Sequence, residues 1–129
     1  MNDIKEVLRM LDFNAKRDKG NFKEVLDAIA LNEFDISNSR ELIISSFLTF
    51  KESKQAIEER VFSFDKLNIS YSSNRIIREE QRNLVKSKLL TQHSLLVTIE
   101  NFFAKCLETG TLEELVKCNL TLIELEKTT

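Results

Sequence analysis

The sequence predicts an all-α protein, an antiparallel bundle of four to five helices with two long central helices and a C-terminal helical hairpin. The chain has 129 residues with two Gly and no Pro, whereas average usage is about 7% Gly and 5% Pro. Apolar residues recur at spacings of three and four along most of the chain, which is the helical period. So few turn residues exclude β-sandwiches, β-barrels and the glycine-rich loops that hold phosphates.

Length and charge limit the class of protein further. We expect residues 1–129 to form a single helical domain, because the length is typical of one domain. The 19 basic and 21 acidic residues give a formal net charge of −2, which disfavours bulk attraction to nucleic acid or to anionic membranes. No apolar run approaches the roughly 20 residues of a membrane span, and the N-terminus lacks a signal-peptide pattern. We therefore expect a cytoplasmic protein without membrane contact.

The N-terminal part is predicted to contain two helices, over 3–17 and 21–32. Ile4, Leu8 and Leu11 give the first its apolar face, and Phe22, Leu26 and Ile29 give the second. Residues 18–20 interrupt the pattern with Asp, Lys and Gly. Because Gly20 is the one strong breaker between the two segments, a single kinked helix is the alternative.

The next helix has the most regular pattern in the chain. A loop over 32–38 precedes it, and Asn38 with Glu41 resembles a capping box. Its seam then steps by four and three through Ile43, Phe47, Phe50, Lys54, Ile57, Val61 and Phe64. Lys54 is the polar exception. A polar seam residue can fix register or oligomeric state, whereas in the alternative its ammonium simply extends past the seam edge to water.

Residues 65–73 are predicted to be an extended connection that ends in an N-cap at Ser72 or Ser73. Leu67, Ile69 and Tyr71 alternate as in a strand, but a lone strand has no visible pairing partner. A long helix over 74–108 follows, and its seam keeps the same rhythm through Val85, Leu89, Gln92, Leu96, Ile99, Phe103 and Cys106.

The chain is predicted to end in a helical hairpin. Gly110 suits the residue that follows a helix, and the segment 111–114 (TLEE) is a capping box that opens a last helix over 112–127. The stagger of Cys106 and Cys118 across this hairpin is too large for a disulfide. We therefore expect two buried, reduced thiols.

The sequence shows no catalytic, cofactor-binding or metal-binding pattern. The chain has one histidine, His93, so a His pair that binds a metal or relays a proton within one chain is excluded. We predict that His93 lies at the core boundary. GxSxG, HExxH and Walker sequences do not occur. We therefore expect a protein that is not an enzyme.

One side of the long helix carries a basic stripe of Arg75, Arg78, Arg82 and Lys86, spaced by three, four and four. Glu79 and Glu80 are close enough along the helix to neutralise it, so a solvated, ion-paired face is one interpretation. An acidic protein partner and a nucleic acid are the others.

A non-enzymatic protein-binding module is the function that we expect, such as a small helical regulator, an immunity-type inhibitor or a chaperone-type adaptor. Apolar residues in predicted loops, Tyr71 among them with Phe34, Ile36 and Ile69, must either enter the core or contact a partner. Another protein, or a second copy in a homodimer, is the expected partner. A nucleic-acid-associated regulator that uses the basic stripe is the alternative, and an enzyme is third.

Overall fold

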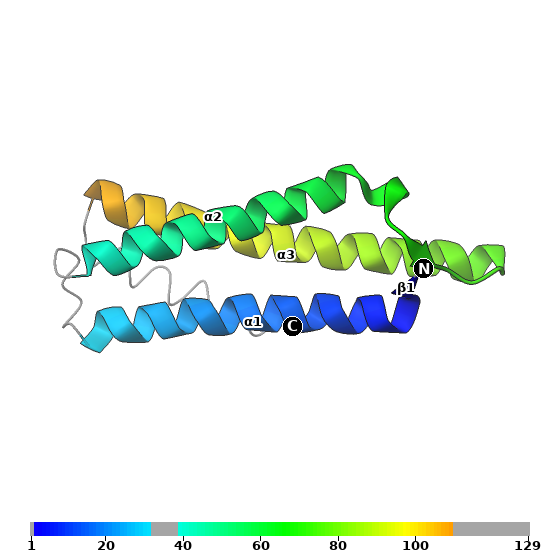
Figure 1. Ribbon diagram of the computed structural model, residues 1–129, viewed down its shortest axis with the longest axis horizontal. Coiled ribbons are helices and arrows are strands. Elements are labelled where there is room, and N and C mark those ends of the chain that lie inside the picture. Colours follow the sequence, from blue (N-terminus) through cyan, green and yellow to red (C-terminus); the bar gives the residue numbers. More distant parts are fainter. Residues whose placement is uncertain (1, 32–38, 110–129) are drawn as a thin grey trace.

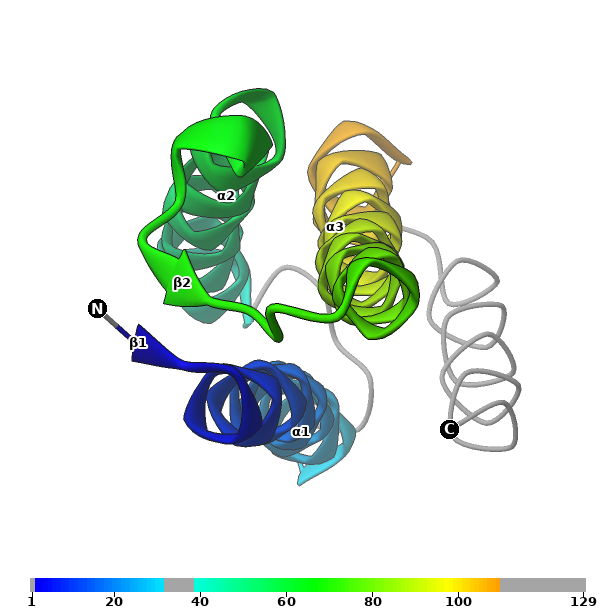
Figure 2. The same ribbon diagram turned by 90° about the vertical axis from the view of Figure 1, so that its right-hand side faces the viewer.

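The computed structural model describes residues 2–31 and 39–109, and within them the chain forms a bundle of α-helices. The helices are α1 (Ile4–Leu31), α2 (Arg40–Phe62) and α3 (Arg75–Thr109). Successive helices run antiparallel, and the three form a triangle when viewed along the bundle (Figures 1 and 2). The all-α class is confirmed.

The predicted number of helices needs correction. Among the described residues there are three α-helices, not the four to five expected for the chain. Residues 3–17 and 21–32, predicted as two helices, belong to the single helix α1. The expected C-terminal hairpin, with Gly110, Cys118 and the helix over 112–127, lies outside the described residues. The proposed cap Asn38 and the loop residues Phe34 and Ile36 also lie outside them.

Burial on both sides of Gly20 explains why α1 continues through it. A glycine inside a helix costs about 1 kcal/mol relative to alanine, whereas burying one large apolar side chain contributes about 1.5–3 kcal/mol. Phe22, Leu26 and Ile29 are buried beyond Gly20, and Leu11 is buried before it. Breaking the helix would move one of these sets out of the core.

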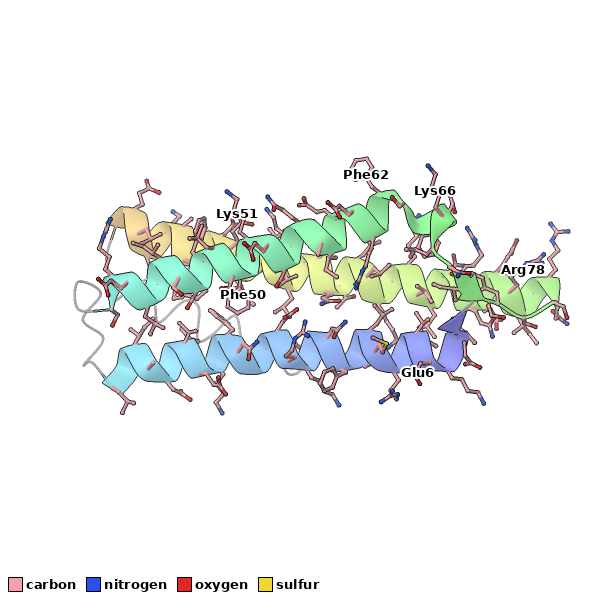
Figure 3. The ribbon with its side chains drawn as sticks, in the orientation of Figure 1. Glu6, Phe50, Lys51, Phe62, Lys66 and Arg78 are labelled. Atoms are coloured by element: carbon pink, nitrogen blue, oxygen red, sulfur yellow. The ribbon has the colours of Figure 1, made fainter. Side chains whose placement is uncertain are left out.

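The core lies along the three seams. Every α3 seam residue from Val85 to Cys106 is buried, and Ile43, Phe50 and Ile57 are buried on α2. The Phe22 ring of α1 meets Phe50 of α2 and Phe102 and Phe103 of α3 edge-on, with ring centroids 6.2, 5.5 and 5.6 Å apart. Figure 3 shows Phe50 directed from α2 toward α1. Cys106 is a buried thiol outside any disulfide.

Residues 63–74, which we call the connector, join α2 to α3 differently from the prediction. After a 3₁₀ turn (Phe64–Lys66), the strand β2 (Ile69–Ser70) pairs in parallel with β1 (Asn2–Asp3). The alternation at Leu67, Ile69 and Tyr71 therefore has a pairing partner at the other end of the chain. The cap of α3 is Asn74, not Ser72 or Ser73, because its Oδ1 accepts from the backbone N–H groups of Ile76 and Ile77 at 3.0 and 3.2 Å.

In the described part of the chain, none of the helices contains a stretch both long and apolar enough to span a bilayer.

The continuity of α1 predicts that Gly20→Ala stabilises the protein by about 0.5–1 kcal/mol, because Ala is the better helix former. Gly20 is exposed, and a Cβ atom there would contact nothing within 4 Å. Urea unfolding measures the change. A destabilised Ala variant would contradict a continuous helix, since alanine is strained in the left-handed conformation of a helix end.

Candidate functional site

One polar residue occupies the apolar seam of each helix, and these residues pair inside the bundle. On α1 the seam steps by four and three through Ile4, Leu8, Leu11, Ala15, Asp18, Phe22, Val25 and Ile29, so Asp18 is its polar member. Lys54 has that place on α2 and Gln92 on α3. Asp18 and Gln92 bond to each other, whereas Lys54 pairs with Glu100 of α3.

The Asp18–Gln92 contact joins α1 to α3 in the core. Gln92 donates from Nε2 to Oδ2 of Asp18 at 3.0 Å, and both side chains are buried. Burial raises the pKa of the Asp18 carboxyl, which the hydrogen bond from Gln92 and the charge of Arg17 partly oppose. The sequence pattern treats Asp18 as part of a helix break, whereas it lies on the continuous seam of α1.

The Lys54–Glu100 ion pair joins α2 to α3. The two side chains are 22% and 15% exposed, and Lys54 Nζ lies 2.5 Å from Glu100 Oε2 and 3.8 Å from Glu58 Oε1. The contact with Glu100 raises the pKa of the Lys54 ammonium. Lys54 is therefore paired within the bundle. This ion pair gives a polar residue in the seam a partner inside the same chain.

His93 lies near the same part of α2. Its Nε2 is 3.1 Å from Glu58 Oε1, and the His93 side chain is 30% exposed. This places His93 at the core boundary, as predicted.

The basic stripe divides into two parts with different surroundings. Arg82 donates to Asp65 Oδ1 at 2.6 Å, and its guanidinium carbon lies 5.2 Å from the Phe64 ring centroid and 5.7 Å from that of Tyr71. Lys86 Nζ lies 6.0 Å from the same Phe64 centroid. We call these five residues the Arg82 cluster. It holds the connector against α3, and burial there raises the pKa of Tyr71.

Arg75 and Arg78 belong to the other part, at the free end of α3. Residues 75–80, which we call the overhang, are all exposed. They extend past the start of α1, with Arg78 near the tip (Figures 1 and 3). Within the described part of the chain, neither arginine forms an ion pair with Glu79 or Glu80, which was one of the interpretations of the stripe.

The overhang also carries apolar side chains that the sequence analysis did not select. Ile76 is 71% exposed and Ile77 is 45% exposed. The seam pattern of α3 could have identified both isoleucines as exposed. The α3 seam, continued back from Val85 by four and three, passes through Gln81 and Arg78, so both isoleucines lie off the seam.

The residues that the sequence suggests for partner binding are Lys54, Tyr71, Arg75, Arg78, Arg82 and Lys86. The structure brings together three of them, Tyr71, Arg82 and Lys86. Arg75 and Arg78 lie apart from them on the overhang, and Lys54 lies on α2 against Glu100. Comparison with protein families, with curated proteins and with solved structures finds no match to this chain. Its function is therefore argued from its own geometry.

The Lys54–Glu100 pair predicts a double-mutant result. Lys54→Met and Glu100→Met should each destabilise the protein, because each leaves a largely buried charge without its partner. We expect a coupling of about 1–2 kcal/mol in urea unfolding, so the double variant recovers much of the loss. The exposed Arg9–Glu6 pair of α1 is the matched control and should show little coupling. Additive effects of Lys54→Met and Glu100→Met would contradict the assignment.

The raised pKa of Asp18 predicts a pH dependence. A carboxyl whose pKa is higher in the folded state binds more protons there, so its contribution to stability falls as pH rises from the ordinary value of 3.8 through the folded pKa. Asp18→Asn keeps an acceptor for Gln92 and removes this effect. As pH rises from 4 to 7, the unfolding free energy of the variant should therefore increase relative to that of the natural protein. A difference that is constant across this range would contradict the prediction.

Proposed function

We propose that this protein is a non-enzymatic helical module that binds another protein through the overhang of α3. One observation carries the proposal: Ile76 and Ile77 are exposed on a helix end that no other described element covers. Single exposed apolar residues are common on protein surfaces, but adjacent ones on a projecting helix suit insertion into an apolar groove of a partner.

Charge narrows the chemistry of the partner. Arg75 and Arg78 flank the two isoleucines and form no ion pair within the described residues. A partner groove with an apolar floor and an acidic rim would satisfy both kinds of group, because rim charges steer association and fix orientation. We therefore propose that an acidic protein partner binds Arg75 and Arg78, and not the whole basic stripe.

A homodimer is one form of this proposal. The overhang places Arg75 and Arg78 before Glu79 and Glu80, so two overhangs side by side and antiparallel would set the basic part of one beside the acidic part of the other. Such a two-fold contact is self-complementary. Light scattering over a range of concentrations distinguishes a second copy from a different partner.

A nucleic-acid partner has less support. Asp65 neutralises Arg82, and Lys86 lies over an aromatic ring of the connector. Arg75, Arg78 and Lys86 are the exposed cations of the stripe, and few phosphate contacts mean weak binding at physiological salt. An enzyme is the third and least favoured function. For the protein-binding module we propose a cytoplasmic location.

The proposal predicts that Ile76→Ser with Ile77→Ser reduces partner recovery at least tenfold in affinity capture from the native host. Because both side chains are exposed, circular dichroism and thermal stability should change little. Leu31→Ser is the matched control, since Leu31 is 86% exposed at the other end of α1, and it should not alter recovery. Equal recovery with the double variant would overturn the proposal.

Arg75→Glu with Arg78→Glu distinguishes the alternatives, with Arg82 retained because it holds the connector. Fluorescence anisotropy with labelled DNA and RNA at low and high salt is the measurement. Salt-sensitive binding that this variant abolishes would favour the nucleic-acid function instead.

A further inference from the structure

A groove opens beside the connector, at the end of the bundle where α1 begins and α2 ends. Its volume is about 330 Å³, and its floor is made by Leu11 of α1 with Val85 and Leu89 of α3. All three floor residues are buried. Met10 and Ile69 contribute to its walls. α2 diverges from α1 toward its C-terminal end (Figure 1), which is the end of the bundle where the groove opens.

The charged groups on the lining differ in whether they are already paired. Glu6 lines the groove and forms an ion pair with Arg9. Arg60, the last basic residue of α2, also lines the groove, is exposed, and makes no ion pair in the described part of the chain. The lining therefore combines an apolar floor with one uncompensated positive charge.

The volume of the groove suits an occupant that is narrower than a helix. One turn of an α-helix with its side chains, about 10–12 Å wide and 5.4 Å long, fills about 500 Å³. A single methylene chain is much narrower. Small-molecule sites typically measure about 300–1,000 Å³ and combine apolar walls with a few polar groups, as this groove does.

We propose that the groove binds a small amphiphile, an unbranched apolar chain that ends in a carboxylate. The chain lies over Leu11, Val85 and Leu89, and the carboxylate pairs with the guanidinium of Arg60, whose planar fork matches a carboxylate. This site is separate from the overhang, so its failure would leave the protein-binding proposal intact.

Sodium decanoate, kept below its micelle-forming concentration, is the probe. Methyl NMR of the whole chain should show saturable shifts at Met10, Val85 and Leu89. Arg60→Gln should weaken decanoate binding at least fivefold and change the binding of decanol, the neutral chain of equal length, less than twofold. Arg78→Gln is the matched control and should change neither.

Filling the groove tests its location. Met10→Trp, at a half-exposed wall position, should weaken both probes at least fivefold while circular dichroism stays unchanged. Val7→Phe on the same helix provides a second filling variant if Met10→Trp does not fold. The proposal is overturned by the absence of saturable shifts, by an Arg60→Gln variant that binds decanoate normally or loses decanol equally, or by folded filling variants that bind both probes normally.

Discussion

The hydrogen bond between Asp18 and Gln92 constrains the rest of the structure, because it fixes α1 lengthwise against α3. Both side chains are buried at seam positions, so sliding one helix by a turn would leave a buried carboxylate and a buried amide unpaired. Such a loss costs several times more than a displaced apolar contact, since apolar packing is non-directional. The register that results covers α3 from Val85 onward and leaves residues 75–80 exposed beyond the start of α1.

The Lys54–Glu100 pair relates α2 to α3 in the same way, and the end of α2 at Phe62 then decides what surrounds the first half of α3. Beyond the end of α2, the overhang is left exposed, and the part of α3 around Arg82 is covered by the connector. Arg82 holds it through Asp65 and two aromatic rings, and Ser72 donates its N–H to Gln81 Oε1 at 2.8 Å. The overhang and the groove are both consequences of this arrangement, since each lies where a helix ends before its neighbour.

Both proposed binding surfaces therefore lie at the same end of the bundle and depend on different chemistry. The overhang offers a large partner exposed isoleucines and two arginines that form no ion pair within the described residues. The groove offers a buried apolar floor and a single cation to a small one. At the core, by contrast, Asp18 bonds to Gln92 and Lys54 pairs with Glu100, so the polar seam residues are engaged within the bundle. A helical chain with few loops places its candidate sites at helix ends.

Local patterns in the sequence determined the all-α class, the approximate extents of α2 and α3, and the seams from Ile43 to Phe64 and from Val85 to Cys106 that face the core. They could do so because helical period and helix ends depend on residues a few positions apart. The tertiary structure alone decided that α1 continues through Gly20, because the burial of Phe22 outweighs a glycine's small cost. It also decided that Ile69 pairs with Asn2, that Asp18 meets Gln92 and that Arg82 binds the connector. Each of these contacts joins residues that are far apart in the sequence and meet only on folding. A pattern of neighbouring residues therefore cannot predict them.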